Sequence, residues 1–302
     1  MCSHSLSIYT SLTIYLLWQE ELELLGLFML LFVLFAVIGC FLGWYFIEGN
    51  WIKGTAIFIV FAGLMNAVAY FFSDKIVLRC YRVKIVSESE QPRLHKIVSN
   101  VALKANLPKP KVGIMKTDTP NAFATGRNPK RAVVACTTGI LNVLNDEELE
   151  GVIAHEMAHV KDRDILVMSV AATIAGAIAI IARTVWYSMY FGGRRREVNP
   201  LILLVVAITA PIAAMLIHLA ISRGREYKAD YVGAKTIMKP WALANALEKL
   251  EAGNRKRPLQ YGNPASASLF IVNPFRGSGF FVIFSTHPPI KERIRRLREA
   301  VF

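Results

Sequence analysis

The sequence predicts a mainly α-helical membrane protein that carries a small α+β domain, and three observations predict this class. The apolar fraction of 54% and the mean hydropathy of +0.40 lie above the range that is usual for soluble proteins. Four apolar runs are each long enough to cross a hydrocarbon core of about 30 Å. The segments outside these runs combine short strand-like stretches with amphipathic helical patterns.

The first two apolar runs predict a transmembrane hairpin over residues 24–72. Leu24–Ile47 and Gly54–Phe72 contain no charged residue, and only the short segment EGNWIK joins them. Aromatic residues stand where an interfacial belt is expected, at Trp44, Tyr45 and Trp51. Residues 1–23 lack the basic start and the cleavage site of a signal peptide, so we expect an interfacial segment or a loosely ordered end there.

The second pair of apolar runs predicts a membrane-associated hairpin over residues 165–221. Its runs are Ile165–Tyr190 and Leu201–Ile221, and the connection FGGRRREVNP places three arginines between them. If both helices crossed the bilayer, these arginines would lie opposite the basic domains, which conflicts with the positive-inside rule. Either the first hairpin sets the membrane orientation in spite of these three arginines, or the second pair is partly buried against protein and does not simply span.

The charge distribution favours a membrane-flanking domain over a nucleic-acid-binding one. The net charge is +13, and 15 of the 35 basic residues lie in residues 73–164, with another 15 after residue 221. Acidic residues are mixed through both segments, and no basic motif is interleaved with aromatic residues. We therefore expect a plasma-membrane protein whose soluble parts face the cytoplasm, with the lipid bilayer as a partner and no nucleic acid. Four scattered cysteines without C-x-x-C spacing predict no disulfide framework.

The soluble segments 73–164 and 222–302 are expected to form one domain in two parts. In the first part, PRLHKIVSNVALKANL has helical apolar spacing, whereas KVGIMKT and RAVVACTTGIL favour strands. The segment TPNAFATGRNP between these strands is rich in turn residues. A further helix begins at NDEELEGVIAHEMAHV, where Asn145 is the expected N-cap and Glu148 follows three residues later.

That last helix carries the pattern H-E-x-x-H at His155, Glu156 and His159. Histidines one helical turn apart have Cβ atoms roughly 5–6 Å apart, so both imidazoles can bind one Zn²⁺ at about 2.0–2.1 Å. Glu156 is offset by about 100° and points beside the metal, where a general base is needed. The alternative is a helix with two solvated histidines, but the apolar neighbours on both sides favour burial.

A catalytic zinc site needs a third protein ligand, and SRGREYKADYVGAKTI offers two candidates. Glu226 and Asp230 are four residues apart and therefore share one helical face. One of them can bind the metal while the other accepts the outer N–H of a ligand histidine. Taken alone the pair is equally typical of a solvated face. Its position directly after the fourth apolar run, together with H-E-x-x-H, makes it specific.

Four segments, in chain order PNAFATG, AHEMAHVKDRD, REYKADYVGA and FSTHPPIKERIRRL, resemble the HtpX-type membrane zinc metallopeptidases, a family related to the CAAX prenyl proteases. The resemblance covers about residues 24–300. It implies a zincin-like (gluzincin) α+β catalytic domain with one Zn²⁺ per chain. It also implies that His155, His159 and Glu226 bind the metal, that Glu156 is the general base, and that Asp230 orients a ligand.

Three further residues are weaker candidates on the same resemblance. Asn121 and Ala122 match an edge strand whose backbone binds substrate as an added strand; the alternative is an ordinary turn. His287 either stabilises the oxyanion or caps the following helix, and Tyr227 and Tyr231 are rival donors. The segment 254–277, rich in Pro, Gly and Asn, either covers the cleft or is a passive loop.

The expected function is zinc-dependent hydrolysis of peptide bonds in polypeptide substrates. The resemblance implies quality control of misfolded or damaged membrane proteins. A CAAX-type processing protease is an alternative, although four apolar runs are few for a membrane chamber. A membrane-anchored zinc protein that holds clients without turnover is another, but a structural zinc site needs no base such as Glu156. A transporter would carry its polar groups within the spans, and here they lie outside them.

Overall fold

The structure is a computed structural model that describes residues 22, 24–44, 47–191, 223–275 and 288–302, without the side chains of 179–191 and 264–265. Predictions for residues 1–21, for Tyr45, for the fourth apolar run and for His287 fall outside these ranges. The chain divides between Phe71 and Phe72 into two compact units, and each is described by itself.

The first unit is built from two apolar helices, Leu24–Trp44 and α2 (Trp51–Cys80), the latter continuing into the second unit. Both are long and apolar enough to cross a membrane. Their outward side chains are apolar as well: a stripe of four residues spaced four apart is 54–61% exposed, formed by Leu25, Met29, Val33 and Val37. Such a face is suited to lipid, because a helix in water normally turns polar residues outwards.

Glycines bring the two helices of the first unit into backbone contact. A Cβ atom added to Gly54 would lie 2.2 Å from the carbonyl oxygen of Gly39 and 2.4 Å from the Cα of Gly43. Gly39 and Gly43 have the G-x-x-x-G spacing that permits close helix crossings in membranes.

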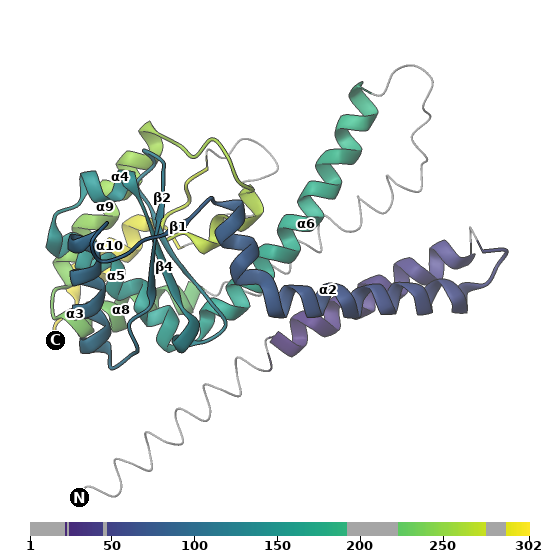
Figure 1. Cartoon of the computed structure of the whole chain (residues 1–302), viewed down its shortest axis with the longest axis horizontal. Coiled ribbons are helices and arrows are strands. Elements are labelled where there is room, and N and C mark those ends of the chain that lie inside the picture. The colour runs from purple at the N-terminus through teal and green to yellow at the C-terminus, as the bar shows by residue number, and fades with distance from the viewer. Residues whose placement is uncertain (1–21, 23, 45–46, 192–222, 276–287) are drawn as a thin grey trace, which may run out of the picture. The chain divides into compact units, whose positions relative to one another are not determined.

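The second unit contains a four-stranded mixed sheet (Figure 1). Its strands are β1 (Lys84–Ile85), β2 (Lys111–Met115), β3 (Ala122–Thr125) and β4 (Val133–Thr137). The order is β1-β2-β4-β3; β2 and β4 are parallel, and the other two pairings are antiparallel. Among the described strands β3 pairs with β4 alone, so it is an edge strand, with Ala122 opposite Cys136.

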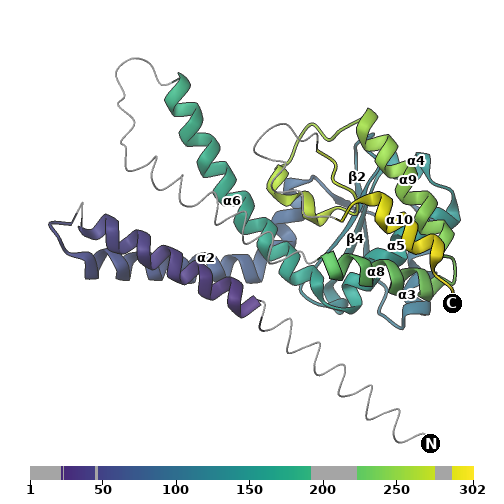
Figure 2. The same cartoon turned by 180° about the vertical axis from the view of Figure 1, so that it is seen from behind.

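Helices pack on both faces of this sheet, as the front and rear views show (Figures 1 and 2). The helical elements are α3 (Pro92–Ala105), η1 (Pro129–Arg131), α4 (Thr138–Val143), α5 (Asp146–Lys161), α6 (Asp164–Phe191), α8 (Arg223–Ile237), α9 (Pro240–Lys256), η2 (Pro264–Leu269) and α10 (Ile290–Glu299). Alternate strand residues enter two cores. Val112, Ala122 and Val134 pack towards α3 and α5, whereas Met115 and Phe123 pack towards α6 and the residues around η2.

Several predictions of elements can be compared directly with this fold. The helix expected from Pro92 and the capping box at the start of α5 are confirmed. The expectation that 131–141 is all strand is wrong beyond Thr137, because the Thr137 hydroxyl accepts from the Ile140 N–H and begins α4. The turn-rich segment 119–129 contains strand β3, since pairing with β4 overrides its local turn preference.

The third apolar run forms helix α6. Its described side chains, from Asp164 to Ile178, are mostly buried within the second unit. This half of the helix therefore packs on protein. For residues 165–178 this agrees with the expectation that the second pair of apolar runs is partly buried against protein.

Candidate metal centre

Helix α5 holds both histidines of the H-E-x-x-H pattern in a fixed, buried place. Its first turn is closed by a capping box, in which the Asn145 side chain accepts from the Glu148 N–H and the Glu148 carboxylate accepts from the Asn145 N–H. Apolar residues on all sides bury the helix from Leu149 to Val160. His155 and His159 are consequently only 1% and 4% exposed.

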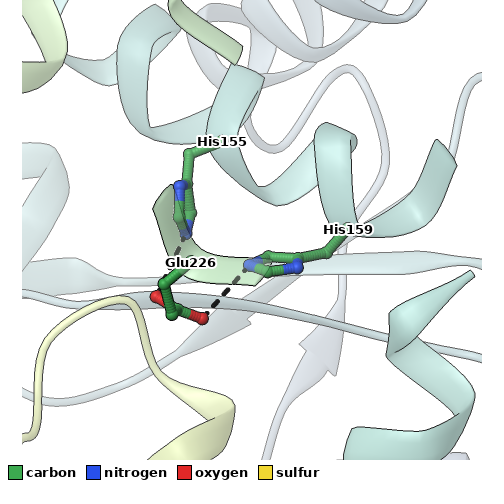
Figure 3. Close-up of side chains that lie close together, drawn as sticks. All are labelled: His155, His159 and Glu226. Carbon is green, nitrogen blue, oxygen red and sulfur yellow. Dashed lines mark ion pairs between the residues drawn. The ribbon is translucent and has the colours of Figure 1, made fainter. Parts of the chain in front are cut away.

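Glu226 comes from helix α8, which is far from α5 in the sequence, and its side chain lies beside the two histidines (Figure 3). The ligand atoms of His155, His159 and Glu226 all lie within 4.8 Å of one another. The Glu226 carboxylate oxygens lie 3.9 Å from Nε2 of His155 and 3.4 Å from Nε2 of His159. The two imidazole rings stand nearly perpendicular, at 87°, so that their Nε2 atoms converge on the carboxylate.

A carboxylate fixes the outer nitrogen of each imidazole. Nδ1 of His155 lies 2.9 Å from Oδ1 of Asp230, and Nδ1 of His159 lies 3.2 Å from Oδ2 of Asp164. With Nδ1 turned outwards to its carboxylate, Nε2 is the nitrogen of each ring that faces Glu226 and that would bind a metal. Burial holds the pKa of His155 below its usual range despite Asp230. Burial also opposes the charged form of His159, but Asp164 and Glu226 outweigh it and raise the pKa of that ring.

Arg293 of α10 is fully buried beneath this centre. Its Nε and Nη2 donate to the two oxygens of Asp230 at 2.8 and 2.7 Å. Nη1 lies 3.5 Å from the Glu226 carboxylate and donates to the Ile271 carbonyl at 2.8 Å. The bidentate pair fixes the orientation of Asp230, and through it that of His155.

Glu156 is buried beside the three donor residues and is 3% exposed. Burial raises its pKa to about 7, and the neighbouring Glu226 adds to the rise. His159, the backbone N–H of Ala124 and Arg293 oppose it. A carboxylate whose pKa lies near neutrality can both accept and return a proton at physiological pH.

The donor set fits a zinc ion. Two imidazole nitrogens and one carboxylate are the protein ligands of a typical catalytic zinc site, which leaves a fourth position open. Four carboxylates, those of Glu156, Asp164, Glu226 and Asp230, also lie together at this centre, with the guanidinium groups of Arg293 and Arg225 near them. Buried carboxylates gathered in one place are costly to ionise unless positive charge lies close to them. A divalent cation bound to these donors would supply such charge.

The structure also locates the weaker candidates. Asn121 is fully buried directly before β3, and Ala122 begins that edge strand. Tyr231 is 49% exposed and packs on Phe302, so it does not face the metal centre. The centroid of the Tyr227 ring lies 3.9 Å from the guanidinium carbon of Arg296, so this ring packs against α10.

Two residues of the centre, Asp164 and Arg293, were not assigned by sequence reasoning. Both lie inside the segments AHEMAHVKDRD and FSTHPPIKERIRRL, which were singled out for other residues. Asp164 follows His159 by five residues, at the start of α6, where an acid is commonly a first-turn residue. Arg293 lies in an arginine-rich helix that has the pattern of a solvated face, and only the tertiary structure shows that it is buried.

Comparison with known proteins identifies relatives over most of the chain. The family model described as Peptidase family M48 matches residues 88–301. A Protease HtpX homolog of Thermococcus sibiricus is 53% identical over 252 residues, covering 82% of this chain and 86% of that protein. Homologs of the same name from Pyrococcus furiosus and Methanocaldococcus jannaschii are each 54% identical, covering 82% and 80% of this chain and 86% of either relative. The crystal structure of S. mikatae Ste24p aligns with a TM-score of 0.46 at 17% identity, covering 94% of this chain and 67% of that one.

Proposed function

The chain belongs to peptidase family M48, and from this premise we propose that it degrades misfolded or damaged membrane proteins from the cytoplasmic side of the plasma membrane. It is a membrane metalloprotease that hydrolyses peptide bonds, and the family's metal is zinc. The observation that carries the proposal is the buried group His155, His159 and Glu226, with Glu156 beside it.

Each residue of the centre has a chemical role in this proposal. His155, His159 and Glu226 would hold zinc, which when bound supplies Lewis acidity to the substrate carbonyl and to water. Glu156 takes a proton from the attacking water on its carboxylate and delivers it to the leaving amine. Asp230 and Asp164 hold the two imidazoles in the tautomer that presents Nε2.

The substrate class follows from how the domain is attached. Helix α2 is apolar enough to cross a membrane and runs without a break into the second unit. The enzyme therefore works beside the bilayer, where unfolded loops and ends of membrane proteins are concentrated. An edge strand such as β3 binds extended peptide, a conformation that folded proteins rarely present. Both features favour unfolded polypeptide near the membrane as the substrate.

Two alternatives differ in what the same centre does. A CAAX-type processing protease would cut a defined C-terminal tail and leave unfolded proteins uncut. A client-holding zinc protein would bind unfolded chains without cleaving them. The buried carboxylate of Glu156 beside the three donor residues favours turnover over holding, because a structural zinc site needs no such group.

The decisive experiment measures cleavage of unfolded casein by the purified, metal-free protein in detergent, before and after Zn²⁺ is added. We expect zinc-dependent cleavage by the wild type. Glu156→Gln should bind zinc one-to-one and lose at least about 100-fold in activity, the usual contribution of a general base. Glu147→Gln on the same helix is the control, because Glu147 is 57% exposed and its partner among the described residues is the surface Lys239, so its activity should be unchanged.

The outcomes separate the candidate functions. Normal cleavage by Glu156→Gln would remove Glu156 as the base. Tight zinc binding without cleavage of any unfolded protein would favour the client-holding alternative. Cleavage confined to a C-terminal prenylated peptide would favour the CAAX-type alternative. For the quality-control role, a destabilised membrane protein in the same micelles should be degraded while its folded form survives.

A further inference from the structure

The outer edge of strand β3 is occupied by a segment of the chain itself. We call this segment, Leu269–Phe275, the strap. The backbone N–H of Ile271 donates to the carbonyl of Ala122 at 3.2 Å, on the side of β3 that does not pair with β4. Ile271 and Val272 are only 2% and 4% exposed, so no other peptide has access to this part of the edge.

Asn121 binds the next strap residue through both ends of its side-chain amide. Its Nδ2 donates to the Val272 carbonyl at 2.6 Å, and its Oδ1 lies 3.5 Å from the Val272 N–H. The same Oδ1 accepts from the N–H of Ala122 at 3.1 Å. Recognition of both backbone groups of one residue does not depend on its side chain. Asn121 would therefore bind any extended peptide placed here.

Arg293 connects the strap to the metal centre. Its Nη1 donates to the Ile271 carbonyl at 2.8 Å and lies 3.5 Å from the Glu226 carboxylate, while Nε and Nη2 pair with Asp230. All four backbone polar groups of Ile271 and Val272 are thus bound, by Ala122, Asn121 and Arg293. This is how an enzyme that adds its substrate to a sheet holds extended peptide next to the reacting atoms.

Aromatic packing anchors the strap one residue away from these contacts. The ring of Phe270 is 1% exposed and lies 4.9 Å from Tyr81 and 5.2 Å from Phe123, measured between ring centroids. Tyr81 is in turn hydrogen-bonded to Ser266 of η2. The anchor lies on the face of the sheet opposite α5. It can therefore be weakened without touching the metal ligands.

We propose that the strap is an internal inhibitor that occupies the peptide-binding edge of β3, and that substrate binds only after the strap has left. The proposal rests on the proposed function, since it assigns the edge beside the metal centre to substrate. Because the closed strap competes with peptide, the apparent affinity for peptide depends on the fraction of molecules whose strap is displaced. An enzyme that attacks unfolded chains is thereby kept inactive at rest.

Two strap variants test the proposal through the steady-state constants for casein cleavage. Ile271→Pro deletes the N–H that donates to Ala122, and Phe270→Ala removes the anchor. For Ile271→Pro we expect KM to fall by about tenfold with kcat unchanged, since the loss of one ordinary hydrogen bond has roughly that effect on the closed state. Phe270→Ala removes buried packing and should lower KM at least as much, again with kcat unchanged. Leu94→Ala is the matched control, because Leu94 is equally buried in the same unit, in the core on the α3 side away from Phe270. Its KM should equal that of the wild type.

Hydrogen exchange at the strap's own backbone amides tests its displacement directly and does not require catalytic turnover. In zinc-loaded Glu156→Gln, the Ile271 amide should exchange slowly at rest and become unprotected when saturating unfolded casein is added. The Leu144 amide, which donates to Ile140 in the same unit, is the internal reference and should not change. Slow exchange at Ile271 with casein bound, or an unchanged KM in both strap variants, would overturn the proposal. Failure of the wild type to cleave casein would instead count against the proposed function, and the exchange measurement would still report whether docked peptide displaces the strap.

Discussion

The residues of the metal centre form pairs in which each ligand is held by a second group. His155 is held by Asp230, and Asp230 is held by the bidentate guanidinium of Arg293. His159 is held by Asp164. This second layer matters because an imidazole that rotates freely loses entropy on binding metal, whereas an oriented one has already lost it.

The role of Asp164 can be tested by Asp164→Asn. We expect zinc affinity to fall by about 10- to 100-fold, the usual effect of removing a group that orients a ligand histidine. A chelator-competition titration measures this. Asp162→Asn is the control, since the Asp162 carboxylate pairs with Lys228 instead. Equal zinc affinities for the two variants would show that Asp164 does not orient His159.

At the scale of elements, the first helical pair depends on the absence of side chains at its crossing. Leu24–Trp44 and α2 meet at Gly39, Gly43 and Gly54, where the backbones are in contact. Apolar side chains alone do not hold helices together in lipid, because the lipid tails are equally apolar. Close backbone packing supplies the attraction instead.

This packing predicts opposite outcomes for two similar substitutions. Gly54→Ala would place a methyl group 2.2 Å from the Gly39 carbonyl oxygen, and such overpacking should cost about 1–3 kcal/mol of unfolding free energy. Gly63→Ala would meet only the Phe32 ring at 3.8 Å, which is ordinary contact, and should be neutral or slightly stabilising. Thermal unfolding of the full chain in detergent, followed by circular dichroism, measures both. Equal melting temperatures would contradict the close crossing.

At the scale of the whole molecule, the metal ligands come from helices far apart in the sequence. His155 and His159 lie on α5, and Glu226 lies on α8, so α6 and residues 192–222 intervene between them. A metal that bridges α5 and α8 therefore ties together the two halves of the second unit's sequence. The free energy of metal binding at this bridge therefore adds to the stability of the folded unit, because the unfolded chain offers no preformed site.

Removal of zinc should accordingly lower the melting temperature of the second unit. At a free zinc concentration of 100 times Kd, linkage predicts about 2.7 kcal/mol of added stability. Differential scanning calorimetry in detergent, with and without zinc, gives the shift. Glu226→Gln should abolish most of it. A melting temperature that does not depend on zinc in the wild type would mean that the metal, if bound, does not bridge α5 and α8.

The sequence alone determined those features that depend on residues close together along the chain. Uncharged runs of about 20 residues marked the first hairpin, and the capping box with H-E-x-x-H marked α5 and the histidine pair. Glu226 and Asp230 were identified as a pair because they share one helical face. Their geometry in the structure agrees with the roles expected for them, which remain predictions.

Only the tertiary structure decided the features that join distant residues. The guanidinium of Arg293 lies beside His155 across 138 positions of sequence, and Asn121 binds Val272 across 151. A local pattern shows Arg293 as one of several arginines on a polar helix, and 254–277 as a segment rich in turn residues. Strand β3, the burial of Arg293 and the strap on the edge of β3 arise because pairing and burial with distant partners outweigh these local preferences.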